Sequence, residues 1–315
     1  MTIKASITIA AMALLPHTAG AQAMDYALSP GLNELPARYF RFSYENDFFT
    51  ATDTYYTQGI QALLIHPGLA ANPANKILVR LKNGVARYGI AAEHNGYTPT
   101  SITNPAPLYN DRPYAGALMI RSFRATIDTV RKQRLTSSVS IGVMGPLAEA
   151  GEMQTAIHRG INGYLPRGWH YQVRNDLVLN YEVLYEKQLL NLGNHISLTA
   201  AGKARVGTLS TKAGIGVTVM TGFFAPDRAF NIYLYAMPFA HVVAYDATLQ
   251  GGLLNKTSEV TVPASEINRT TLQMRYGLVM RYKRLDVSYS FTSQTREFEN
   301  ANPHRWGCAS LGWRW

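Results

Sequence analysis

Apolar and polar residues alternate along most of the chain with a period of two, which is the pattern of β-strands that have one apolar face. Near the start, for example, Phe40, Phe42 and Tyr44 alternate with polar residues. Alternating segments lie at 40–45, 87–93, 138–143, 177–185, 273–282 and 285–292. Counting candidate segments of roughly 9 to 11 residues gives about twelve strands. An even number is typical of bacterial membrane barrels.

A soluble β-sandwich produces the same alternation, so the pattern alone leaves two all-β architectures open. Tyrosines near the strand ends favour a membrane barrel, because aromatic girdles lie there. The chain also ends on WGCASLGWRW, where Leu311, Trp313 and Trp315 alternate to a terminal aromatic residue. This ending resembles the signal that the barrel assembly machinery recognises. Together with an export signal, these features predict a transmembrane antiparallel β-barrel of about twelve strands.

The N-terminus has the layout of a cleavable secretory signal. Lys4 is followed by an apolar run over 5–15 and by small residues at 19–23, as in secreted proteins. We therefore expect residues 1–23 to be a signal peptide and residues 24–315 to form a single outer-membrane barrel domain. After the signal, no window approaches the roughly 18 apolar residues that a membrane helix needs.

Charge and composition narrow the possible partners. The formal charge is +10 and the sequence pI is about 9.6, which suits nucleic acid, an anionic membrane surface or an anionic lipid. Export makes nucleic acid the least suitable of the three. Charged residues are only 16% of the chain, and 19 Tyr with 11 Phe is a heavy aromatic load, as expected for a β-protein with one face in lipid. A single cysteine, Cys308, excludes a disulfide framework.

One segment interrupts the alternation. Residues 145–163, GPLAEAGEMQTAIHRGING, contain good helix formers between a proline and closing glycines, and they predict a short helix in a loop. Gln154, His158 and Ile161 fall on one face of that helix. Two further stretches, 97–116 and 165–176, have the Pro, Gly and Asn content of structured loops.

A polar cluster accompanies the first two strands. Asn46 and Asp47 follow the first strand, Thr57 begins the second, and His158 lies on the helix. Singly, each has an ordinary interpretation: a turn for Asn46 and Asp47, a strand residue for Thr57, an exposed helix histidine for His158. The chain has no G-x-S-x-G elbow, H-E-x-x-H helix or phosphate-binding glycine loop. Any chemistry therefore depends on this cluster, which neighbouring barrel strands would bring together.

Several segments resemble the LpxR-type lipid A 3'-O-deacylases of Gram-negative outer membranes. They are SYENDFFTATDTYYTQGI, YNDRPYAGAL, GEMQTAIHRGING with PRGWHYQ, and SYSFTSQTREFENANPHRWGCASL. The resemblance covers nearly the whole mature chain. It implies a twelve-stranded outer-membrane barrel whose active site lies at the outer rim, between the barrel wall and a helix of an extracellular loop. It also implies a calcium-dependent carboxylic ester hydrolase that removes the 3'-linked acyloxyacyl chain of lipid A.

By this resemblance, His158 matches the catalytic histidine, Asn46 and Asp47 the Asn-Asp pair, and Thr57 the threonine. Gln154, one helical turn before His158, is added as a candidate on geometry alone. An imidazole titrates near neutral pH, so His158 suits a general base that takes a proton from water. A hard cation, Ca²⁺, held by the oxygens of Asn46 and Asp47 would stabilise the oxyanion. Alternatively, Asp47 orients the imidazole, while Thr57 either donates to the ester carbonyl or holds the loop.

The sequence also departs from the family. Well-described members use a lysine in the loop after the third strand and a glutamate shortly after the histidine. Here the corresponding loop has no lysine, and Tyr164 stands six residues after His158. Arg112, Arg159 or Arg167 would then bind the lipid phosphates. Each of these arginines also has an ordinary interpretation, as a solvated loop residue or, for Arg112, as a partner of Asp111 inside the barrel.

Three functions remain open at this point: a lipid A esterase, a non-enzymatic pore or structural barrel, and an outer-membrane phospholipase. A pore predicts conductance and no dependence on His158. An esterase predicts a lumen filled by charged residues, which the alternation identifies as Arg41, Glu45, Arg87, Glu93 and Glu182. The histidine on a loop helix favours the enzyme, since a pore does not need it.

Overall fold

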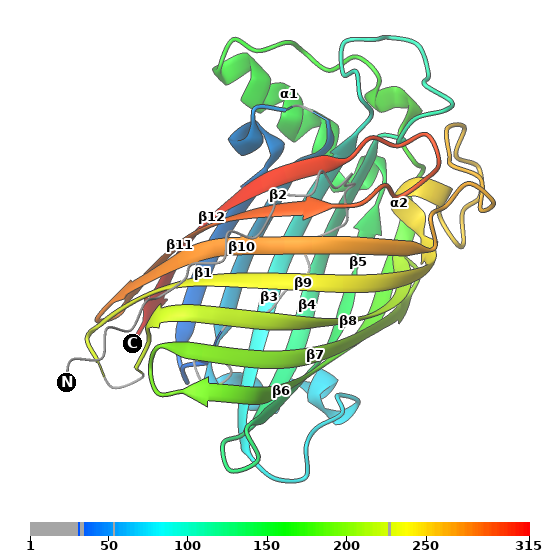
Figure 1. Cartoon of the computed structure of the whole chain (residues 1–315). Helices are drawn as coiled ribbons and strands as arrows, with labels where there is room; N and C mark the ends of the chain where they lie inside the picture. Colours follow the sequence, from blue (N-terminus) through cyan, green and yellow to red (C-terminus); the bar gives the residue numbers. More distant parts are fainter. Residues whose placement is uncertain (1–30, 32–34, 53, 226–227) are drawn as a thin grey trace.

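Twelve antiparallel strands close into a barrel in which β1 pairs with β12 (Figure 1). The computed structural model describes residues 31, 35–52, 54–225 and 228–315; the signal peptide expected at 1–23 lies outside these ranges. The strands are β1 (Tyr39–Asn46), β2 (Tyr55–Ile65), β3 (Val85–Thr98), β4 (Ala115–Asp128), β5 (Gln133–Met144), β6 (Asp176–Leu192), β7 (Ile196–Gly207), β8 (Ser210–Phe223), β9 (Phe230–Asp246), β10 (Thr270–Tyr282), β11 (Leu285–Gln294) and β12 (His304–Arg314). The predicted fold class is confirmed.

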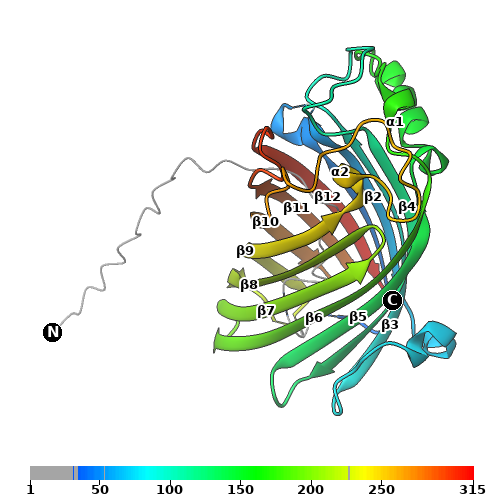
Figure 2. The ribbon, with the colours of Figure 1, turned by 90° about the vertical axis from the view of Figure 1, so that its right-hand side faces the viewer.

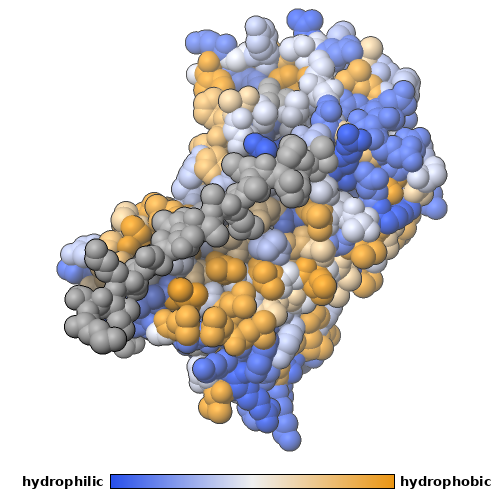
Figure 3. All heavy atoms as spheres, in the orientation of Figure 1, coloured by the Kyte–Doolittle hydropathy of each residue, from blue (hydrophilic) through white to orange (hydrophobic). Residues whose placement is uncertain are grey.

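The period-two alternation places apolar side chains on the outside of the barrel. In β11, Leu285, Val287 and Tyr289 are exposed, whereas Asp286 and Ser290, on the opposite face of the strand, are buried. Figure 3 shows hydrophobic residues gathered across the middle of the barrel, with hydrophilic ones at both ends. A pleated strand sends successive side chains to opposite faces, so this wall presents an apolar surface to lipid.

Charged side chains fill the lumen. Glu182 is contacted by Arg121 at 3.3 Å, Lys203 at 3.3 Å and Arg205 at 2.5 Å. Glu93 joins this cluster through Arg121 at 2.9 Å. Buried charges are tolerated only when they are paired in this way. A second pair links β1 to β10, where Glu45 lies 2.8 Å from Arg275.

The other two predicted interior residues also point inward. Arg41 donates to Gln61 at 3.3 Å, and Arg87 donates to the carbonyl of Leu35 at 3.1 Å. The lumen thus holds the charged residues that the alternation assigned to it.

The end of the barrel that carries α1 (Ala150–Gly160) and α2 (Ala247–Gln250) is closed by loops and buried aromatic side chains. Figure 2 shows both helices at this end, and the turns η2 (Pro67–Ala71) and η3 (Pro73–Lys76) at the opposite end. The cluster that closes it includes Tyr55, Tyr56, Tyr97, Phe298 and Trp306. Within the described part of the chain, no helix is long and apolar enough to cross a membrane.

The segment predicted to interrupt the alternation contains η4 (Pro146–Ala148) followed by α1. It packs on the outer side of the wall, against β3 and β4. Gly116 of β4 makes this possible, because a Cβ there would come within 2.8 Å of the Ala150 Cβ and 3.2 Å of the Ala148 Cβ. His94 of β3 is hydrogen-bonded to the Ala148 carbonyl at 2.8 Å. The helix therefore lies directly on the barrel wall near its rim.

Candidate functional site

The turn between β1 and β2 is held by Asn46 and Asp47. The Asn46 Oδ1 accepts a hydrogen bond from the Phe48 N–H at 2.7 Å and so caps η1 (Asp47–Thr50). The Asn46 amide donates to the Tyr44 hydroxyl at 2.9 Å and to the Thr57 carbonyl. Asp47 is only 1% exposed, and its Oδ2 accepts from the Thr54 N–H at 2.5 Å. The pair therefore shapes the turn and contacts the start of β2.

Gln154 joins α1 to this turn. Its Nε2 donates to the Thr57 Oγ1 at 2.9 Å, and its Oε1 accepts from the Trp169 Nε1 at 2.7 Å. Trp169 begins η5 (Trp169–Tyr171) in the loop after α1. Asn46, Thr57, Gln154 and Trp169 thus form one chain of contacts between the barrel wall and the helix. Sequence reasoning missed Trp169, whose only signal was its place in the stretch PRGWHYQ.

His158 lies one helical turn after Gln154, on the same face of α1. Its Nδ1 is 2.5 Å from the carbonyl oxygen of Tyr164. A carbonyl only accepts hydrogen bonds, so Nδ1 carries the proton and Nε2 keeps a lone pair. The backbone of Tyr164 therefore orients the imidazole, and the alternative that Asp47 does so through Nδ1 is not supported. The side chain of Tyr164 is exposed.

The three candidate phosphate-binding arginines differ in position. Arg112 is fully buried, where it contacts Glu297, donates to the Thr248 Oγ1 at 2.7 Å and lies 4.4 Å from the centre of the Tyr97 ring. It closes the barrel mouth, so its assignment to a lipid phosphate is corrected. Its guanidinium pairs with Glu297, and Asp111 accepts from the Arg112 backbone N–H at 2.7 Å instead. Arg159 and Arg167 are exposed near α1, where an anionic group can reach them.

The chemical type of the oxygen atoms around η1 suits a hard cation, because carboxylate and amide oxygens are typical Ca²⁺ ligands. They comprise the Asn46 amide oxygen and the Asp47 carboxylate, although each already accepts a backbone hydrogen bond. Among the described residues, no three His, Cys, Asp or Glu side chains come close enough to hold a metal by themselves. Ca²⁺ takes six to eight oxygen ligands, so backbone carbonyls, water or substrate would have to complete such a site.

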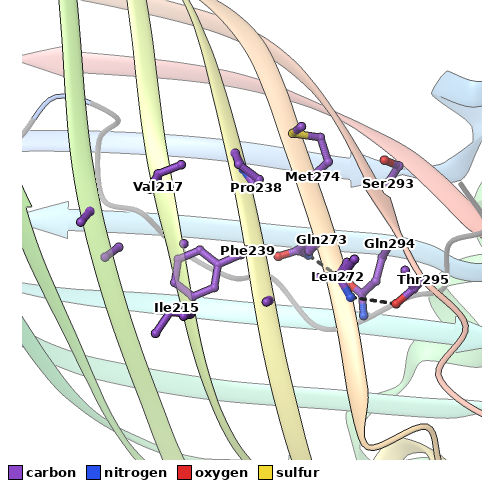
Figure 4. Close-up of a pocket in the computed structure, with 14 residues that line it drawn as sticks. Ile215, Val217, Pro238, Phe239, Leu272, Gln273, Met274, Ser293, Gln294 and Thr295 are labelled. Carbon is purple, nitrogen blue, oxygen red and sulfur yellow. Dashed lines mark hydrogen bonds between the residues drawn. The ribbon is translucent and has the colours of Figure 1, made fainter. Parts of the chain in front are cut away.

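A hollow of about 740 Å³ lies on the barrel wall across β7 to β11 (Figure 4). Ile215, Val217, Leu272 and Met274 contribute apolar side chains to it. Ile215 is 72% exposed and Leu272 52% exposed, so this part of the wall faces outward, towards lipid. The candidate residues lie on β1, β2 and α1 instead, so the hollow is separate from the site.

Comparisons with known proteins agree with this architecture. The family model described as "Outer membrane protein LpxR" matches residues 7–315. The solved structure of LpxR from Salmonella typhimurium has a TM-score of 0.74 and 19% sequence identity, covering 88% of this chain and 100% of that one. No curated protein sequence matches the chain.

Other barrels are less similar. The β-domain of the Bordetella autotransporter BrkA has a TM-score of 0.49 and 8% identity, covering 88% of this chain and 98% of that one. The translocator domain of NalP from Neisseria meningitidis has a TM-score of 0.45 and 10% identity, covering 88% and 87%.

Proposed function

Because the chain belongs to the LpxR family of outer-membrane proteins, we propose that it is an outer-membrane lipid A deacylase. The reaction is hydrolysis of the ester that links the 3'-acyloxyacyl chain to lipid A in lipopolysaccharide. The observation that carries the proposal is the orientation of the His158 imidazole. His158 lies on α1, which packs against the outer wall, and its Nδ1 is held by the carbonyl oxygen of Tyr164. In this proposal, a substrate in the outer leaflet would reach His158 from the lipid side of the barrel wall.

In this proposal, His158 acts as the general base. Its Nε2 takes a proton from water while the water oxygen attacks the ester carbonyl carbon. The tetrahedral intermediate then collapses, the bond to the sugar oxygen breaks, and Nε2 returns the proton to that leaving oxygen. The Tyr164 carbonyl stabilises the imidazolium through the Nδ1 proton, as a carboxylate does in a catalytic triad.

Asn46 and Asp47 would hold a calcium ion in this proposal. When bound, the ion would supply positive charge near the developing oxyanion. Asp47 contributes the formal negative charge that attracts a hard cation, and Asn46 contributes a neutral oxygen. Arg159 and Arg167, both exposed beside α1, would bind the lipid phosphates. β12, with Leu311 and Trp313 outward, would present the signal for the barrel assembly machinery.

The filled lumen does not favour a pore. The Glu182 cluster and the buried Arg112–Glu297 pair occupy the interior and its mouth. A phospholipase of the outer membrane would use the same base, so only its product distinguishes it from a lipid A deacylase.

Mass spectrometry of lipid A from a Gram-negative host tests the proposal. We expect cells that make the wild-type protein to lose one acyloxyacyl unit, and the loss to vanish with His158→Ala or with calcium chelated. His170→Ala is the matched control, because His170 is an exposed histidine on the next loop. Unchanged lipid A with a folded, heat-modifiable barrel would refute the deacylase, and lysophospholipid in its place would identify a phospholipase.

A further inference from the structure

We infer that Trp169 is a positioning residue, which sets the direction of a hydrogen-bond chain so that the Thr57 hydroxyl donates to the ester carbonyl oxygen. The inference rests on the proposed function. It starts from the three-residue chain of Trp169, Gln154 and Thr57, whose two hydrogen bonds measure 2.7 Å and 2.9 Å.

The direction of this chain follows from one donor. The indole N–H of Trp169 only donates, so its partner on Gln154 must be the carbonyl oxygen Oε1. The other end of the Gln154 amide is then an NH₂ group, which donates to the Thr57 Oγ1. Without the indole, the amide could turn over and accept from Thr57 instead, because its two ends have nearly the same shape.

The hydroxyl group of Thr57 still has a hydrogen-bond donor to offer. Its oxygen accepts from Gln154, and among the described residues nothing accepts the proton that this hydroxyl carries. The Thr57 carbonyl accepts from the Asn46 amide, so the backbone is fixed as well. A buried donor that lacks an acceptor is costly, and a substrate carbonyl would supply one. Thr57 contacts Gln154, which lies one helical turn before His158 on α1, so the donor and the base are linked through the same helix.

Trp169 itself is held firmly, as a positioning residue requires. Its ring packs on Tyr114 with 4.9 Å between centroids, and it is only 9% exposed. The Tyr114 hydroxyl is anchored in turn on the Ile102 carbonyl at 3.2 Å. The backbone of Gly151 also lies against the indole. The indole N–H therefore has little freedom to point elsewhere.

Two isosteric substitutions test the direction. Gln154→Glu keeps the shape but replaces the amide by a carboxylate, which accepts from Trp169 and takes the Thr57 proton for itself. Losing one donor to an oxyanion typically lowers kcat by 10²- to 10³-fold, and we expect a loss on the order of 10²-fold with KM nearly unchanged. Trp169→Phe keeps the ring packing and removes only the donor, so we expect a smaller loss, about tenfold.

The deciding measurement is a double-mutant cycle on lipid A in detergent micelles, with heat-modifiability as the folding control. In a Thr57→Val background, Trp169→Phe should cause no further loss of kcat, because the proton that it directs is gone. A merely structural tryptophan would lower the activity equally in both backgrounds. That result, or a Trp169→Phe variant as active as wild type, would overturn the inference.

A second readout is independent of turnover. In ¹⁵N-indole spectra of the folded barrel, the Trp169 N–H should exchange slowly with solvent, and Gln154→Leu should shift its resonance upfield. If the wild type is inactive on lipid A, the proposed function fails, yet this spectrum still decides whether the hydrogen-bond chain exists. An unchanged resonance in Gln154→Leu contradicts it.

Discussion

Adding one methyl group at Gly151 should disable the site without unfolding the barrel. Gly151 lies in the first turn of α1, with its backbone against the Trp169 ring. A Cβ built there would lie 2.7 Å from the Trp169 Cγ, 2.9 Å from its Cδ2 and 3.1 Å from its Cβ. Carbon atoms prefer separations of about 3.5 to 4.0 Å. The helix or the indole must therefore move by about 1 Å to restore contact.

The size of the effect follows from what that movement breaks. The Trp169–Gln154 hydrogen bond is 2.7 Å long, so a shift of about 1 Å takes it beyond useful hydrogen-bonding distance. A misplacement of about 1 Å in a catalytic arrangement can cost about 10²-fold in rate. Alanine stabilises a helix relative to glycine by up to about 1 kcal/mol. This gain partly offsets the destabilisation caused by the close contact, but it does not restore the geometry of the hydrogen bond. We expect Gly151→Ala to lose between tenfold and a hundredfold of the activity, roughly.

Gly160→Ala is the matched control, because a Cβ at this other end of α1 meets nothing within 4 Å. It should keep wild-type activity and leave the helix equally or more stable. The assay is the initial rate of lipid A deacylation in micelles, with heat-modifiability to confirm that all three proteins are folded. If Gly151→Ala is as active as Gly160→Ala, close packing of α1 on Trp169 does not position the site.

Three further outcomes follow from the barrel interior. Burial raises the pKa of Glu297 to about 8, against the opposing effect of Arg112. The protonated, neutral Glu297 therefore stabilises the folded barrel. This contribution is complete below the unfolded pKa of about 4.3, and it is lost as the pH rises through the folded pKa of about 8. The unfolding temperature should therefore fall between pH 6 and pH 9, and Glu297→Gln should flatten this dependence; an equally steep fall in the variant would contradict it. Glu182→Gln should lower the free energy of unfolding in detergent by about 3 to 5 kcal/mol, because it leaves the buried cations around it without their carboxylate partner. A loss below about 1 kcal/mol, as for a surface ion pair, would show that the cluster is solvated. In planar bilayers we expect no steady conductance, and stable open channels would refute a closed lumen.

The sequence by itself determined the barrel and the contact between Asn46 and the start of the second strand. Alternation with a period of two specifies which side chains face lipid, because successive residues of a pleated strand point to opposite faces. Glu45, Glu93 and Glu182 were assigned to the lumen on this basis, and the structure buries all three there. Asn46 and Thr57 were expected to meet because consecutive strands of a barrel pair, and the Asn46 amide does contact the Thr57 carbonyl.

Only the tertiary structure decided how the loops complete the site. Arg112 was a candidate for the lipid phosphates or for a pair with Asp111, yet its loop folds into the barrel mouth, where its partner Glu297 lies 185 residues further along the chain. The orienting partner of His158 is a backbone carbonyl, which every residue carries, so no side-chain pattern could single out Tyr164. Trp169 acquires its role only because α1 and the following loop pack on the same strands. Strand alternation is local, whereas these contacts depend on where irregular loops settle in space.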